Sequence, residues 1–277
     1  HTHACDALLM ALGRLNFRTQ IHSLRHFLTC GHTMGAFVIY GPSSCGGGHV
    51  WLLRRSIEQI EQLAAHHGWM EVRHDCAARC RRPDAASFFS TLSCRLNLGW
   101  VPGGDLSQLS VRLRSFSERR PLRIVVDNVD LLHDDQLGQI LQLWQALCAN
   151  GGLPQAACHL LLFLISRRET QPLGCHSGLP FSRLAWKAAI PILLDPVVTF
   201  PRGELESWRA ELINWLPKVP DWFFDDDILG RLYERTQGIP EDTLYEICKH
   251  WSASPDDQDT GAQHIDLAYR RWLTPSG

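Results

Sequence analysis

The 277-residue chain lacks long hydrophobic runs, strong net charge and matched cysteine pairs. No apolar segment approaches the ~20 residues that span a bilayer, so we predict no membrane partner. A formal net charge of −2 argues against general binding to nucleic acid or anionic membranes. The first residues hold no basic region leading into an apolar core, so we predict no signal peptide and a cytoplasmic location. The abrupt start suggests a fragment of a longer protein.

Cysteine, in contrast, is abundant, with ten residues scattered along the chain. In a cytosolic α/β protein, such residues act mostly as small buried hydrophobes. His74, Cys76, Cys80 and, further on, Cys94 carry zinc-ligand chemistry, but they contain neither a C-x-x-C nor a second matched pair. We therefore predict no metal site, with zinc as the less favoured alternative. A Cys45/His49 nucleophile is a weaker alternative still, because no other base accompanies the thiol.

Short apolar segments alternate with segments of helical periodicity in the first two thirds of the chain. Strands are expected at residues 36–40, 70–74, 122–127, 159–166 and 189–194, and helices up to residue 66, then at 85–98, 105–118 and 134–148. This alternation predicts an α/β fold with a five-stranded parallel sheet and helices on both faces. From Phe200 on, only helical patterns occur, at 204–216, 227–236, 241–251 and 263–273. We therefore predict an α/β domain over residues 1–199 and a helical lid subdomain over residues 200–277.

A glycine-rich loop, Gly41-Pro-Ser-Ser-Cys-Gly-Gly-Gly-His49, follows the first expected strand. The strand–loop–helix layout is that of a P-loop, G-x-x-x-x-G-K-[ST], with Gly41 and Gly46 at the two glycine positions. Gly47 replaces the lysine that neutralises phosphate charge, and Gly48 replaces the hydroxyl residue that holds Mg²⁺. His49 lies one residue after the hydroxyl position of the motif, and a histidine is largely neutral at pH 7. We predict a degenerate nucleotide site without catalytic residues, although its backbone N–H groups still suit an anion.

The third expected strand ends in Asp127, where an active P-loop ATPase has its Mg²⁺-holding acid. Asn128 occupies the place of the water-activating glutamate, and Asp130 follows two residues later. An amide cannot act as a base, so we expect Asp127 to cap a turn or to pair with a cation. Arg167 and Arg168 follow the fourth strand at the sheet edge where open α/β folds bind ligands. We favour an ion pair with Asp127 or Asp130 over a phosphate contact, because the phosphate-binding lysine is missing.

In this order, the features resemble the STAND branch of the AAA+-like P-loop NTPases, which includes NLR-type immune switches. The resemblance spans about residues 12 to 250, and its motifs are Gly35–Pro42, Asp127-Asn-Val-Asp130 as the second acidic motif, Ser166-Arg167 as the arginine sensor, and Gly238-Ile-Pro240 after Thr236 as the G-x-P motif of the lid. Because the lysine, the hydroxyl and the catalytic acid are replaced, the chain most resembles the inactive STAND modules. The resemblance implies a pseudo-NTPase without a cofactor, with ATP or ADP as a weak possibility. It also implies a bacterial conflict or signalling system with an effector or adaptor as protein partner.

Three functions remain open at this level. The favoured one is an inactive scaffold or sensor that binds protein partners, and a homo-oligomer is compatible with it. Ten tryptophans support it mildly, with Trp100 and residues 222–224 as candidate exposed anchors, although most tryptophans should fill the core. The second is a divergent ATP-binding switch that uses Asp127 and Arg167. The third is a DNA-associated AAA+ subunit with a dead ATP site, which would need a basic stripe from Arg79, Arg81, Arg82, Arg112, Arg114, Arg119 and Arg120. Nucleic acid is not the expected partner.

Overall fold

The computed structural model describes residues 11, 15, 18–42, 48–64, 68–77, 84–149, 151–153, 159–167, 187–215 and 221–252. The chain groups into two compact units. The core unit comprises Thr19–Ser43 and Ser56–Pro196, and the lid unit comprises His1–Arg18, Ser44–Arg55 and Val197–Gly277. The division into domains at residue 200 stays a prediction.

The core unit is built on five parallel strands in the order β2-β3-β4-β1-β5. Their bounds are β1 Met34–Tyr40, β2 Met70–Asp75, β3 Leu122–Asp127, β4 Leu160–Ser166 and β5 Ile192–Leu193. Every residue of β1 and of β4 is buried. Continuous burial explains why these strands read as apolar runs rather than as alternating patterns. The predicted α/β fold and its five-stranded parallel sheet are confirmed.

The fifth strand is shorter than the expected residues 189–194. Only Ile192 and Leu193 pair with β1, whereas Lys187 and Ile190 form an isolated antiparallel bridge. Pro191 lies between the bridge and the strand and has no N–H to donate to a ladder. The apolar pattern could not show where hydrogen bonding begins.

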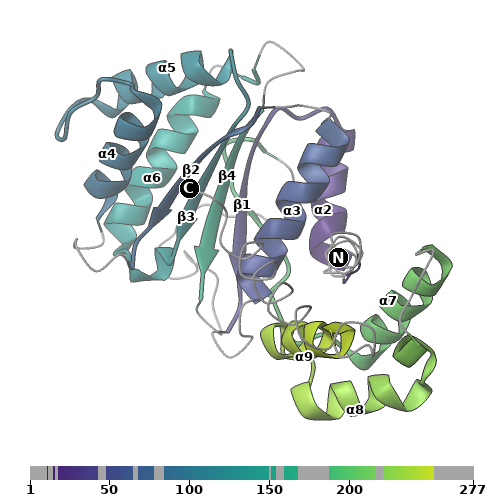
Figure 1. Ribbon diagram of the computed structural model, residues 1–277. Coiled ribbons are helices and arrows are strands. Elements are labelled where there is room, and N and C mark those ends of the chain that lie inside the picture. The colour runs from purple at the N-terminus through teal and green to yellow at the C-terminus, as the bar shows by residue number, and fades with distance from the viewer. Residues whose placement is uncertain are drawn as a thin grey trace. The chain divides into compact units, whose positions relative to one another are not determined.

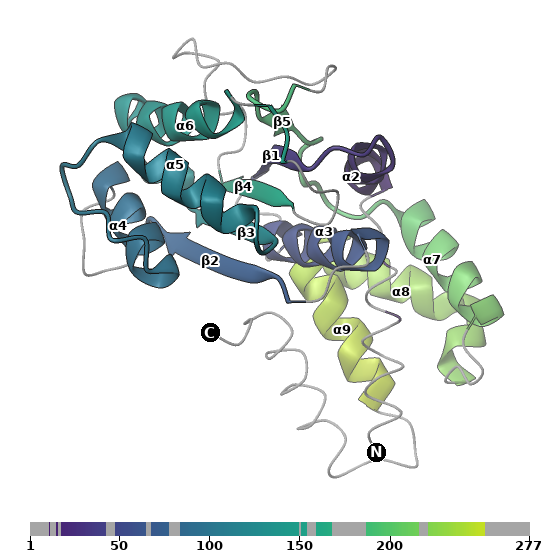
Figure 2. The same ribbon diagram turned by 90° about the horizontal axis from the view of Figure 1, so that it is seen from above.

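Helices cover both faces of the sheet, as predicted (Figures 1 and 2). On one face lie α2 Arg18–Thr29 and α3 Gly48–Ala64, and on the other α4 Ala85–Leu96, α5 Leu106–Ser117 and α6 Asp134–Cys148. Alternate residues of β1 serve the two faces. Val38 belongs to the core that includes α4, α5 and α6, while the ring of Phe37 packs on Phe27 of α2 and on Phe163. Helix α4 ends two residues earlier than expected, because Asn97 adopts the left-handed conformation at φ 52°.

The lid unit is helical over its described residues from 202 on, as expected. Its elements are α7 Arg202–Trp215, the 3-10 turn η3 Asp221–Phe224, α8 Asp226–Thr236 and α9 Pro240–Ser252. Trp208 is buried in this unit, and its indole N–H donates to the carbonyl of Ala11 over 2.7 Å. The helix expected at 263–273 lies outside the described residues. Nowhere in the described residues is there a helix with the length and apolarity to cross a bilayer.

Candidate functional site

The carboxylate of Asp127 is held by the protein itself at the carboxyl edge of the sheet. Nη2 of Arg73 lies 2.9 Å from Oδ2, and Nη2 of Arg167 lies 3.8 Å from Oδ1. Oδ1 also accepts the backbone N–H of Asn128 over 3.0 Å. The Asp127 side chain is only 8% exposed, and these partners offset the cost of burying a carboxylate there. The ion pair that we favoured for Arg167 is present, but Arg73 is the closer partner.

The sequence analysis did not identify Arg73 as the partner of Asp127, because that pairing follows from the register between two strands. In the parallel pairing of β2 and β3, Arg73 lies opposite Val125, two residues before Asp127. Residues two apart in a strand project to the same face, so Arg73 and Asp127 share a face on neighbouring strands. The register between two strands is needed to see this, and the sequence does not give it.

Asn128 joins the ends of two strands. Its side-chain amide donates to Oδ1 of Asp75 over 2.7 Å, and the same oxygen accepts the N–H of Ala77 over 2.8 Å. Its backbone is left-handed, with φ at 56°, which asparagine tolerates better than most residues. A glutamate at this position would offer no donor to Asp75 and would add a third carboxylate beside it. The residue therefore suits a structural joint and not a general base.

Asp130 and Cys76 complete the cluster at this edge. Oδ1 of Asp130 accepts the backbone N–H of Arg167 over 3.0 Å, so Arg167 meets both acids of the motif. The N–H of Cys76 donates to the Asp127 carbonyl over 3.0 Å. Burial, with the nearby carboxylates of Asp75, Asp127 and Asp130, raises the pKa of the Cys76 thiol to about 12. The thiol therefore stays protonated at neutral pH, which disfavours it as a zinc ligand.

The remaining members of the zinc alternative are not gathered around Cys76 in the described part of the chain. Nδ1 of His74 lies 3.1 Å from Oγ1 of Thr91, and Cys94 is exposed on α4. Among the described residues, no three His, Cys, Asp or Glu side chains are grouped to hold a metal ion. Cys80 and Cys45 lie outside those residues, so the expectation of no metal site stays a prediction.

Part of the glycine loop lies outside the described residues, namely 43–47 with Gly46 and Gly47. Gly41 is buried after β1 in the core unit, whereas Gly48 and His49 begin α3 in the lid unit. His49 is only 2% exposed. At Gly48, a Cβ atom would lie 2.6 Å from Cγ1 of Val197 and 3.0 Å from Cγ of Pro240. A serine or threonine at this P-loop position does not fit the observed packing.

Pro240 begins α9 after a turn of defined geometry. Gly238 has φ at 70°, and its carbonyl accepts the N–H of Phe200 over 2.7 Å. Oγ1 of Thr236 accepts the N–H of Gly238 over 3.2 Å and the hydroxyl of Thr243 over 3.0 Å. The residues of the predicted G-x-P motif therefore build the connection between α8 and α9.

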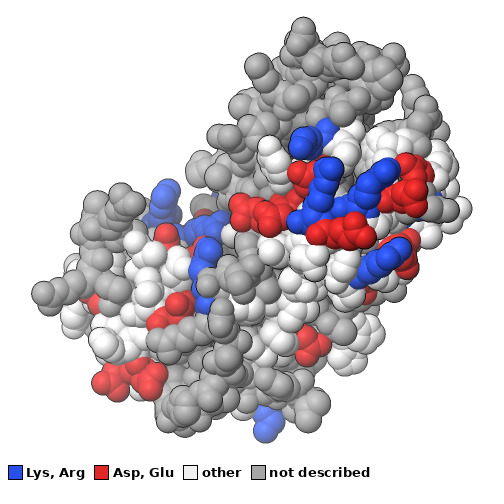
Figure 3. Space-filling view, turned by 90° about the horizontal axis from the view of Figure 1, so that it is seen from below, with Lys and Arg blue, Asp and Glu red and all other residues white. Residues whose placement is uncertain are grey.

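Arg114 of α5 and Arg120, which follows that helix, would be needed by the DNA-associated alternative, and both contact backbone carbonyls of the core unit. Arg114 donates to the carbonyls of Leu147, Gly151 and Gly152, and Arg120 donates to that of Gly68. In the face drawn in Figure 3, Lys and Arg side chains are interspersed with Asp and Glu over the described residues. These contacts give Arg114 and Arg120 a structural role. Arg79, Arg81 and Arg82 lie outside the described residues.

A parallel sheet with an acid at the end of β3 and a glycine loop after β1, followed in the chain by a helical unit, defines the P-loop NTPase class of folds. The chain belongs to the inactive STAND family, whose model matches residues 12–165. This confirms the resemblance inferred from the motifs, and the family's description as inactive supports a non-catalytic module. No curated protein matches the chain.

Two solved structures share the fold over nearly the whole chain. The ORC2 protein of Aeropyrum pernix, in its ADPNP–ADP complexes, has a TM-score of 0.53 and 11% identity, over 93% of this chain and 67% of that one. The Cdc6 protein of Pyrobaculum aerophilum has a TM-score of 0.52 and 13% identity, over 95% of this chain and 70% of that one. At such identities, the likeness shows the fold alone.

Proposed function

We propose that this chain is an inactive NTPase-fold scaffold or sensor that binds a protein effector or adaptor in a bacterial immunity or signalling system. The observation that carries the proposal is the pairing of Asp127 with Arg73 over 2.9 Å. In an active P-loop ATPase, this acid presents its oxygens toward Mg²⁺. Here Oδ2 faces a guanidinium and Oδ1 accepts a backbone N–H. Magnesium, which dehydrates reluctantly, would have to displace the arginine.

The other parts of a triphosphate site are missing from the sequence, and each had a separate task. A working site needs a lysine for phosphate charge, a hydroxyl for the metal and an acid for water. Gly47, Gly48 and Asn128 supply none of these. Because three independent tasks are lost, no single substitution is expected to restore turnover. What remains is a folded module whose surface is available for other partners.

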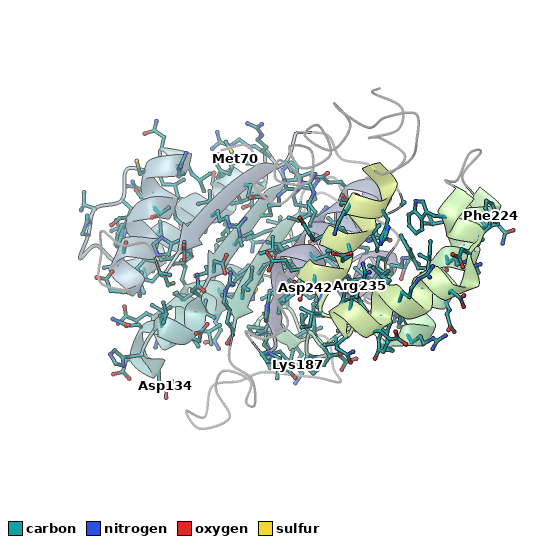
Figure 4. All side chains as sticks on the ribbon, turned by 60° about the horizontal axis from the view of Figure 1, so that its bottom comes forward. Met70, Asp134, Lys187, Phe224, Arg235 and Asp242 are labelled. Carbon is teal, nitrogen blue, oxygen red and sulfur yellow. The ribbon has the colours of Figure 1, made fainter. Side chains whose placement is uncertain are left out.

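The lid unit carries a surface that suits a protein partner. A groove of about 460 Å³ is lined by Arg202, Glu206, Arg209, Ala210, Ile213 and Leu229 of α7 and α8. Its walls combine apolar side chains with arginines, and Nη2 of Arg209 lies 3.4 Å from the carbonyl of Phe224. The Phe224 side chain is 56% exposed at the end of η3 (Figure 4). Exposed aromatic residues near an apolar groove are typical of interfaces, which supports the scaffold role.

Trp100, the other candidate anchor, has a packing role. Its ring meets Phe89 edge-to-face at 5.9 Å, and its backbone N–H donates to Oγ of Ser93 over 2.9 Å. It is partly buried against the core of α4 to α6. Phe224 is therefore the better anchor for mutagenesis.

Calorimetry with Mg·ATP, followed by an assay of phosphate release, tests the proposal. We expect no micromolar binding and no release above the protein-free rate. Asp127→Ala serves as the matched control, because it removes the acid at the end of β3, where an active P-loop ATPase holds its metal ion. Phosphate release by the wild-type chain that this substitution abolishes would overturn the inactive assignment.

A further inference from the structure

Two close contacts of the lid unit involve five residues, which we call the lid joint: Gly48 with Val197 and Pro240, and Gly238 with Phe200. They come from three separate parts of the chain. Val197 and Phe200 are almost fully buried, at 0% and 2% exposure. The joint thus links the start of α3, the segment before α7 and the start of α9 within one unit.

The contact at Gly48 leaves no room for a side chain. A Cβ there would stand 2.6 Å from Cγ1 of Val197 and 3.0 Å from Cγ of Pro240, and real Cβ atoms do not approach other atoms as closely as the shorter distance. Neither neighbour is the flexible end of a long side chain. Valine has one torsion angle, and the proline ring is fixed to the backbone. Any larger residue at 48 must therefore move the segment of Val197 or the start of α9.

Gly238 also contacts the segment 197–200, through Phe200. The N–H of Phe200 donates to the Gly238 carbonyl over 2.7 Å, and a Cβ at Gly238 would overlap the Phe200 carbonyl. The φ of 70° at Gly238 also disfavours any other residue. Both glycines of the joint are thus required by close approach, and they hold the segment 197–200 in place.

We propose that the lid joint is a permanent latch: α9 is docked on the first turn of α3 by packing, independently of nucleotide. The glycine that removes the metal-holding hydroxyl is also the glycine that lets Val197 and Pro240 approach. Gly48 thus accounts both for the missing hydroxyl of the P-loop and for the close packing of Val197 and Pro240 within the lid unit. This inference goes beyond the proposed scaffold role, because it assigns the lid unit an internal packing that does not follow ATP.

A double-mutant cycle between positions 48 and 197 tests the latch. Gly48→Ala should loosen the joint, so the amides of α9 should exchange with D₂O about tenfold faster, the factor that an overpacking cost of roughly 1.4 kcal/mol gives. Val197→Ala removes the Cγ1 atom that the new methyl meets. The double variant should therefore exchange more slowly than the sum of the two single effects predicts.

Gly203→Ala is the matched control, since a Cβ at this α7 glycine meets nothing within 4 Å. It should leave α9 exchange unchanged. Exchange in β4 of the core unit reports whether any variant is merely misfolded, and it should stay at the wild-type rate. Strictly additive effects at 48 and 197, or no effect of Gly48→Ala on α9, would overturn the latch.

A final arm adds Mg·ATP to the wild-type chain. Unchanged α9 exchange supports the latch. Slower α9 exchange on addition of nucleotide would refute it even if no phosphate is released. The latch and the absence of hydrolysis can therefore fail separately.

Discussion

At the scale of single residues, the acidic motif has become a structural element. Arg73, Arg167 and the N–H of Asn128 surround the carboxylate of Asp127 at the end of a buried strand. The Asp130 carboxylate accepts the backbone N–H of Arg167, and the Asn128 side-chain amide donates to the Asp75 carboxylate. Among the described residues of the site, Asp127, Asn128, Asp130 and Arg167 each have a partner inside the chain. The motif retains its positions in sequence while its hydrogen bonds serve the fold.

Arg73→Met should therefore destabilise the core unit. Removing the closer cation leaves a carboxylate that is 8% exposed with Arg167 at 3.8 Å, and we expect a loss of about 2 kcal/mol in the free energy of unfolding. The loss is smaller than for a fully buried pair because Arg73 is 29% exposed. Urea denaturation measures it. Arg95→Met, at an exposed position of α4, is the control.

The double variant Arg73→Met/Asp127→Asn removes both charges and should recover much of that loss, because no unpaired carboxylate remains. Equal stability of wild type and Arg73→Met would mean that Arg167 alone suffices for Asp127. That result would also weaken the argument that Arg73 excludes a metal ion.

At the scale of elements, α9 carries a partly exposed charge cluster around Glu246, whose side chain is 17% exposed. Glu246 lies 3.6 Å from both Arg235 of α8 and Lys249, and 3.8 Å from His250. The ring of Trp222 from η3 packs on His250 at 5.8 Å between centroids. Arg235 and the start of α9, with Asp242, can be followed in Figure 4. The Glu246 carboxylate thus connects α8 and α9, and the His250 ring adds the contact with η3.

His250 gives this cluster a pH dependence of known sign. Burial lowers the pKa of His250, Glu246 opposes that shift, and Arg235, Lys249 and Arg231 add to it. A histidine whose pKa is lower in the folded state binds protons more tightly in the unfolded state. The free energy of unfolding is therefore not reduced by this group above a pH of about 6.5, and it decreases as the pH falls through that value.

Thermal denaturation should therefore show the lid unit losing stability between pH 7.5 and 5.5. His250→Gln should lose less over the same interval, and His22→Gln, at an exposed position of α2, should behave as wild type. A wild-type stability that rises on acidification would contradict the assignment.

At the scale of the whole molecule, charge argues against a nucleic-acid role. The net charge is −2, Arg114 of α5 donates to the carbonyls of Leu147, Gly151 and Gly152, and Arg120 donates to that of Gly68. The solved ORC and Cdc6 proteins share the fold, but at 11–13% identity they carry no evidence for the same ligand. A fold of this class supports many functions, so the surface decides the partner.

We therefore expect no salt-dependent binding of a mixed-sequence DNA duplex tighter than about 1 μM at physiological salt, the tight end of ordinary non-specific binding. Fluorescence anisotropy over a salt series measures this, with heparin as a polyanion control. Tight binding of the duplex but not of heparin would revive the DNA-associated alternative.

The sequence by itself determined the strand and helix order, the parallel sheet and the loss of P-loop chemistry. Apolar periodicity follows local burial, and the glycines at positions 47 and 48 are visible in the sequence without any knowledge of the fold. Only the tertiary structure decided that Arg73 neutralises Asp127, that Asn128 holds Asp75, and that Val197 and Pro240 fill the space beside Gly48. These contacts join residues far apart in the chain, and their existence depends on strand register and close packing, which no local pattern encodes.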